Sequence, residues 1–346
     1  MTQVRPDPPV KTGGSGEAVP SDVEPHDLRE TQRDTGGGGG TIAKGAVRRL
    51  GDRVFQGLST WSGAAILIIL ALVAAFLLWQ GLPALTSPAA DLPYGPFPQF
   101  VIPLVFGTVW AALLALLMGV PVAVAIALFI SHYAPRRLAA GLGYVVDLLA
   151  AVPSVVYGLW GIGVLAPVLQ PTFVWLTERL AFIPLFAGPA SGTGRTVLTA
   201  AMVLAVMILP IVTALSREVF LQTPKLHEEA ALALGATRWE MIRMAVFPFA
   251  RPGIVSAAML GLGRALGETM AVAMVLSPSM IISFALLTSQ NPNTIAANIA
   301  LSFPEAYGLG INQLIATGLV LFVITLAVNM IARGIVNRRR DFSGAN

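Results

Sequence analysis

An arginine and a glutamate stand four residues apart inside a long apolar stretch of the sequence. Arg264 and Glu268 both fall in the segment Gly253–Leu276, which we predict to span a membrane. Each charge near the centre of a bilayer costs about 2.5–3.5 kcal/mol, so such a pair is seldom present without a function. A guanidinium stays charged and matches an oxyanion with its planar fork of donors. We therefore hypothesise that Arg264 faces an anion; a structural ion pair at helical i,i+4 spacing is the alternative.

The Glu268 carboxylate suggests which anions could pass. Hydrogen phosphate keeps an O–H group near neutral pH and can donate it to a carboxylate, whereas sulfate has no such donor and would be repelled. We expect Glu268 to orient Arg264 and to favour protonated oxyanions.

Three further polar residues are candidates for a substrate pathway. Thr269 directly follows Glu268, and Ser154 and Tyr157 follow Pro153, where the helix backbone is expected to be distorted. For Ser154 and Tyr157, ordinary contacts between helices are the alternative. We expect no catalytic residue, cofactor or metal site, because the sequence has no cysteine and its three histidines are far apart.

The composition indicates a polytopic membrane protein. Of the 346 residues, 55% are hydrophobic and only 12% are charged, and the mean hydropathy is +0.74. A soluble domain carries roughly 25% charged residues. We predict a disordered cytoplasmic tail over residues 1–45, a membrane domain over 46–340 and a short cytoplasmic tail over 341–346. The fold class predicted is an all-α membrane helix bundle.

Six segments are long and apolar enough to cross a bilayer, which takes about 20 residues. The predicted spans are Leu58–Trp79, Val105–Ile130, Leu142–Leu169, Thr196–Leu215, Gly253–Leu276 and Ile311–Ile335. With the N-terminus inside, the inner segments flanking the spans carry 15 Lys and Arg residues, and the outer loops carry only Arg179 and Arg195. This bias predicts that both termini are cytoplasmic.

The inner loop over residues 217–252 is predicted to contain two short helices. Thr223 is a suitable N-cap for the first helix, and Gly235 can end it in a left-handed conformation. Thr237 and Glu240 form a capping-box pattern that opens the second. An amphipathic segment on the membrane surface is the alternative, but the acidic residues of the first helix would be repelled by anionic lipid. We expect this loop to dock into a groove of another protein.

The same loop resembles the EAA motif of ABC-importer permeases. The resemblance rests on Glu229, Ala230 and Ala231, followed after three residues by Gly235 and then by a hydrophobic run into Pro248. It implies that these four residues couple the chain to ATPase subunits. The sequence contains no Gly-Lys pair and hence no P-loop, so ATP would bind to separate subunits.

A closer resemblance is to the PstC-type permeases of bacterial phosphate importers. It rests on four segments: Gly261–Thr269, Pro153–Gly161, Phe106–Thr108 and Leu321–Thr325. The resemblance implies a six-span type I ABC importer permease in which Arg264 and Glu268 take part in phosphate passage.

The implied setting is a bacterial plasma membrane, with the chain in contact with lipid. The implied partners are a second homologous permease, two ATP-binding subunits and an extracytoplasmic phosphate-binding protein. No nucleic-acid partner is expected, because the basic residues mostly flank apolar segments. Three alternatives remain open: an importer of molybdate or sulfate, an ion-coupled secondary anion carrier, and a structural membrane anchor.

Overall fold

The computed structural model describes residues 50–340. The predicted tails 1–45 and 341–346 lie outside these residues. The chain forms two compact units, residues 1–62 and residues 63–346. The described part of the first unit is the beginning of helix α1; the remainder of the description concerns the second unit.

The described residues are almost entirely helical. The α-helices are α1 (Leu50–Thr86), α2 (Phe97–Leu128), α3 (Arg136–Ala150), α4 (Ser154–Trp160), α5 (Ala166–Arg179), α6 (Val197–Leu221), α7 (Lys225–Ala233), α8 (Arg238–Met241), α9 (Phe247–Leu266), α10 (Met270–Val275), α11 (Ile295–Ser302) and α12 (Leu309–Arg340). The π-helices are η2 (Phe129–Tyr133), η3 (Gly161–Leu165) and η4 (Ile242–Val246), and the 3₁₀-helices are η1 (Ala89–Asp91) and η5 (Phe303–Glu305). The two short strands, β1 (Pro278–Ser279) and β2 (Asn291–Pro292), pair in parallel.

Within residues 50–340, six helical segments are long and apolar enough to cross a membrane, which confirms the predicted number of spans for this part of the chain. They are Val54–Thr86, Phe97–Tyr133, Ser154–Arg179, Val197–Leu221, Arg238–Gly267 and Leu309–Gly334. The chain is thus an all-α, multi-pass membrane protein.

The predicted third span, Leu142–Leu169, was wrong in its first half. The helix ends at Ala150, and a new one begins at Ser154 and runs to Arg179. Pro153 explains the break, because proline lacks an N–H group and disfavours the helical conformation in the residue before it. The amphipathic α3 is therefore a separate helix.

The predicted fifth span, Gly253–Leu276, was wrong at both ends. It is continuous with α8, so the second helix of the inner loop is the beginning of the span rather than a short separate helix. At its other end α9 stops at Leu266, and the chain breaks before α10 begins at Met270. Gly267, a poor helix former, is the C-cap of α9.

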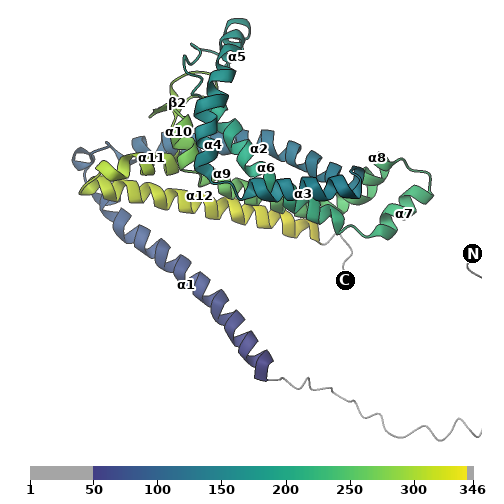
Figure 1. The fold of residues 1–346 in the computed structure, drawn as a ribbon. Coiled ribbons are helices and arrows are strands. Elements are labelled where there is room, and N and C mark those ends of the chain that lie inside the picture. Colours follow the sequence, from purple (N-terminus) through teal and green to yellow (C-terminus); the bar gives the residue numbers. More distant parts are fainter. Residues whose placement is uncertain (1–49, 341–346) are drawn as a thin grey trace, which may run out of the picture. The chain divides into compact units, whose positions relative to one another are not determined.

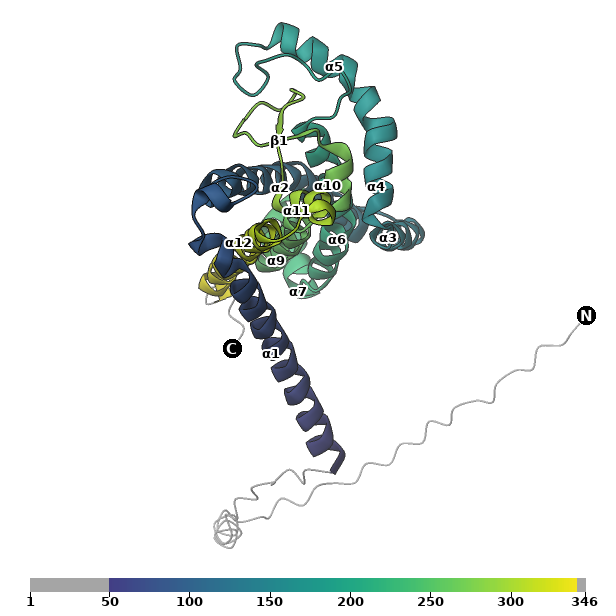
Figure 2. The same ribbon diagram turned by 90° about the vertical axis from the view of Figure 1, so that its left-hand side faces the viewer.

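Small residues bring the central helices close together. A Cβ atom at Gly119 of α2 would lie 3.1 Å from the carbonyl oxygen of Ala205 in α6. A Cβ at Gly261 of α9 would lie 2.9 Å from a methyl group of Val212, also in α6. Close packing of this kind holds membrane helices together, since lipid supplies no hydrophobic drive for their association. Figures 1 and 2 show α2, α6 and α9 side by side, with α7 and α11 near opposite ends of the bundle.

Candidate functional site

Arg264 lies on the last turn of α9 and faces a cavity of about 410 Å³. The cavity is lined by Ile211, Met259, Leu260, Gly263, Arg264 and Asn329. The Arg264 Nε atom is buried and has no hydrogen-bond partner in the described part of the chain. Within residues 50–340, no carboxylate lies within 4.0 Å of the guanidinium. A permanent cation therefore stands in a largely apolar cavity with unused donors, the arrangement that an incoming anion could complete.

Glu268 forms no ion pair with Arg264 within residues 50–340, which contradicts the structural alternative of an i,i+4 pair. Because α9 ends at Leu266, Glu268 lies in the break between helices and not one turn further along a continuous helix. Its side chain is only 9% exposed, and Oε1 accepts a hydrogen bond of 3.1 Å from the backbone N–H of Ala271. The carboxylate thus caps the first turn of α10. The expectation that Glu268 orients Arg264 was wrong in this geometry.

The other predicted pathway residues lie on both sides of a tight helix contact. A Cβ at Gly158 of α4 would lie 2.9 Å from the Cα atom of Ala271 in α10, so α4, which carries Ser154 and Tyr157, packs closely against α10. Tyr157 is buried, and its hydroxyl donates to the carbonyl of Leu149 over 2.9 Å. The Thr269 hydroxyl donates to the carbonyl of Gly267 over 3.1 Å. Ser154, half-buried, begins α4.

A second arginine, Arg195, binds the other end of α10, and no sequence pattern points to this role. Arg195 donates from Nε to the carbonyl of Val275 and from Nη2 to the carbonyls of Met274 and Leu276, over 2.8–3.4 Å. These carbonyls end α10 and have no intrahelical donors of their own. A loop arginine followed 80 residues later by a short apolar helix is not a recognisable local pattern, so only the tertiary structure could reveal this cap.

Asn291 links the segments around Arg195 and the end of α10 through hydrogen bonds of its buried side chain. Its fully buried amide donates to the carbonyls of Arg195, Ser277 and Ser289, and its Oδ1 atom accepts from the N–H of Val197. The loop before α6, the beginning of α6 and the segment after α10 are therefore joined through one side chain.

The loop over residues 217–252 presents α7 to its surroundings. No residue of α7 is buried; Leu226 within the helix and Leu234 at its C-cap are 73% and 90% exposed. Gly235 has the predicted left-handed conformation, with φ +84°. The predicted capping box is confirmed: the Glu240 carboxylate accepts from the N–H of Thr237, and the Thr237 hydroxyl accepts from the N–H of Glu240.

The first helix of the loop does not use its predicted cap. Pro224 occupies the N-cap position, and no side chain caps the helix. Thr223 was a wrong choice, because Pro224 has extended dihedral angles and the helix begins one residue later than expected. Instead, α7 contacts the end of the second span through His132 of η2, whose Nε2 atom lies 3.6 Å from Oε1 of Glu228.

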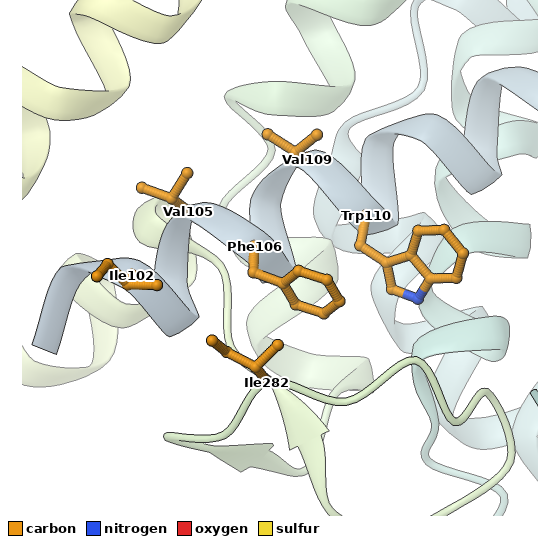
Figure 3. Close-up of a pocket in the computed structure, with 6 residues that line it drawn as sticks. All are labelled: Ile102, Val105, Phe106, Val109, Trp110 and Ile282. Carbon is orange, nitrogen blue, oxygen red and sulfur yellow. The ribbon is translucent and has the colours of Figure 1, made fainter. Parts of the chain in front are cut away.

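A second pocket, shown in Figure 3, has a different character. It measures about 420 Å³ and is lined by Ile102, Val105, Phe106, Val109, Trp110 and Ile282. Its lining is apolar except for the indole N–H of Trp110, and none of its lining residues carries a charge that could attract an anion. Among the described residues, no group of His, Asp and Glu side chains could hold a metal ion.

The fold is that of a type I ABC importer permease. It aligns with a chain of the inward-facing MetNI methionine ABC transporter with a TM-score of 0.52 at 16% identity, covering 70% of this chain and 98% of that one. It also aligns with a chain of a bacterial ABC transporter that imports alginate, with a TM-score of 0.54 at 18% identity, covering 83% and 99%.

Residues 115–341 match the family described as the binding-protein-dependent transport system inner membrane component, and the chain belongs to this family. Similar curated proteins are phosphate transport system permease protein PstC 2 of Mycobacterium tuberculosis, 45% identical over 305 residues (83% of this chain, 92% of the relative), and PstC of Mycobacterium leprae, 42% identical over 311 residues (85% and 95%). The chain is therefore a transport subunit rather than an enzyme, and its family works with an ATPase and a binding protein.

Proposed function

We propose that this chain is the permease subunit of an ATP-driven importer of inorganic phosphate and forms half of its translocation pathway. The names of its relatives support this substrate, since similar phosphate permeases align with more than four-fifths of the chain. The structural observation that carries the proposal is the Arg264 guanidinium, which faces a cavity with its Nε atom buried and unpartnered within residues 50–340. A phosphate oxygen would supply the missing acceptor.

In this proposal Glu268, Thr269, Ser154 and Tyr157 belong to the same pathway as Arg264. The close contact between α4 and α10 supports placing them in one neighbourhood. Glu268 uses Oε1 to cap α10, and Oε2 makes no hydrogen bond within residues 50–340. That oxygen could accept the O–H group of hydrogen phosphate.

The exposed helix α7 would dock on an ATP-binding subunit through Glu229, Ala230 and Ala231, with Gly235 allowing the chain to turn sharply afterwards. The support is the exposure of Leu226 and Leu234, large apolar side chains that lose contact with water when a helix enters a groove. The complete importer would contain two ATP-binding subunits, a second homologous permease and an extracytoplasmic phosphate-binding protein.

The chain would lie in a bacterial plasma membrane with both termini in the cytoplasm. The distribution of Lys and Arg along the sequence supports this orientation. It places α7 on the side where ATP is available, which the coupling role requires.

The test is ATP-driven uptake of radioactive phosphate into vesicles that contain the complete importer purified through this chain. We expect uptake to require both ATP and the binding protein, and sulfate or molybdate in excess to compete poorly. Uptake that persists without ATP would indicate a secondary carrier. Preferential uptake of sulfate or molybdate would indicate an importer of that oxyanion.

A further inference from the structure

The cavity beside Arg264 contains a second polar side chain with no assigned role. Asn329 of α12 reaches the cavity from a different helix, and every other lining residue is apolar or glycine. Asn329 lies within the sixth span, Leu309–Gly334, whose most apolar 18-residue stretch has a mean hydropathy of 2.5. A primary amide in such a segment is costly unless it has a partner.

Asn329 is exposed on the surface of α12. Within the described residues, its side chain makes no hydrogen bond. Other polar side chains on the same helix are engaged. The Thr325 hydroxyl, one turn earlier, donates to the carbonyls of Leu321 and Phe322 over 3.0 and 2.8 Å. The Asn312 amide donates to the carbonyl of Gln80 over 2.6 Å. Asn329 is therefore a free polar group facing the same cavity as a free guanidinium.

We propose that Asn329 is a second anion-contacting residue of the permease and that it acts with Arg264 on one bound oxyanion. This inference rests on the proposed function. An amide offers both an N–H donor and a carbonyl acceptor. While the anion is held beside the Arg264 cation, Nδ2 can donate to an anionic oxygen, and Oδ1, rather than Oε2 of Glu268, accepts the single O–H group that hydrogen phosphate retains. Sulfate fills only the first of these roles.

An amide at this position, unlike a carboxylate, does not neutralise the positive charge of Arg264. Glu268 forms no ion pair with Arg264 and is held by the N–H of Ala271, so it stands apart from the guanidinium. A carboxylate beside Arg264 would neutralise the cation that attracts the anion. A neutral amide leaves the positive charge of Arg264 intact and still provides an acceptor for the proton of the substrate.

A chain with no native cysteine permits a direct test. Asn329→Cys and the matched control Thr325→Cys each place a single thiol on α12, and mass spectrometry of this chain identifies the modified site in the intact importer. The importer is labelled with a small charged thiol reagent during ATP turnover, with phosphate-loaded or unloaded binding protein. We expect phosphate to slow labelling at position 329 several-fold and to leave position 325 unchanged. Equal labelling of Asn329→Cys with and without phosphate would overturn the inference.

Transport by Asn329→Leu supplies the second measurement. We expect phosphate uptake at saturating loaded binding protein to fall by about 10-fold, the effect of losing one hydrogen bond to a charged group. Thr325→Val should keep its uptake. Uptake by Asn329→Leu within twofold of the native chain, beside strong loss in Arg264→Gln, would overturn the inference and leave the proposed function standing.

Two other outcomes also decide the matter. If Asn329→Leu loses the second permease during purification, Asn329 is an interface residue and the inference is wrong. If the native importer takes up no phosphate, the proposed function itself fails, and the inference fails with it.

Discussion

Two arginines of this protein use the same side chain in opposite ways. Arg195 places its donors on three backbone carbonyls at the end of α10 and so caps that helix. Arg264 faces a cavity, with its Nε atom buried and without a partner in the described part of the chain. The guanidinium of Arg195 therefore stabilises the fold, and the guanidinium of Arg264 has donors free to bind a ligand. Partnering, rather than burial or charge, separates a structural cation from one that can bind a ligand.

Arg264 should give the largest effect. Arg264→Gln removes the charge and the fork of donors, and we expect phosphate uptake to fall on the order of 10- to 100-fold, since hydrogen bonds to charged groups contribute about 1.5–3 kcal/mol. Arg264→Lys keeps the charge but loses the planar geometry, and should recover only part of the rate. Uptake is measured in vesicles with equal amounts of assembled importer. Phosphate uptake by Arg264→Gln at the native rate would show that Arg264 does not bind the substrate and would contradict the contrast with Arg195.

Arg195 should affect stability instead. Arg195→Met leaves three carbonyls at the end of α10 without a donor, and we expect a loss of at least about 2 kcal/mol in the free energy of unfolding. The measurement is thermal unfolding of the purified importer, with uptake expressed per folded complex. Normal stability combined with lost uptake would show that Arg195 belongs to the pathway.

Glu268→Gln distinguishes two roles of the glutamate: capping α10 and excluding sulfate through its negative charge. Glutamine can still accept the N–H of Ala271, so α10 should keep its cap. If the negative charge helps to exclude sulfate, competition by sulfate for phosphate uptake should strengthen several-fold. Unchanged discrimination would leave Glu268 with the structural role only and place it beside Arg195 in the comparison.

The capping box should give the smallest effect, because it is exposed and serves one helix end. Thr237→Ala removes the acceptor for the N–H of Glu240 and should cost about 1 kcal/mol. Hydrogen exchange at the backbone of α8 should quicken accordingly, while Thr237→Ser should retain native protection. Unchanged protection of the α8 backbone from hydrogen exchange in Thr237→Ala would mean that contacts other than the capping box stabilise the beginning of α8.

Local patterns predicted the number of spans, the left-handed Gly235 and the capping box, because each depends on residues close in the sequence. Hydropathy could not locate the break after Leu266, since the residues on both sides are equally apolar. Read without that break, the sequence puts Glu268 one turn after Arg264 on a single helix, whereas the structure puts it between α9 and α10.

Contacts across long sequence separations were beyond prediction for the same reason. Arg195 contacts the end of α10 some 80 residues away, and Asn329 and Arg264 line one cavity only because α12 lies against α9. Arg264 itself could be identified from sequence, because a charge in an apolar segment is conspicuous whatever surrounds it.

The unbroken run from α8 through η4 to α9 has a mechanical consequence. Its 30 residues, Arg238–Gly267, make a rod about 45 Å long at 1.5 Å per residue. One tip of the rod adjoins the loop that follows α7, and the other carries Arg264. Under the coupling proposed above, a movement of the α8 end of this rod would tilt the end that carries Arg264, without a flexible segment between the two.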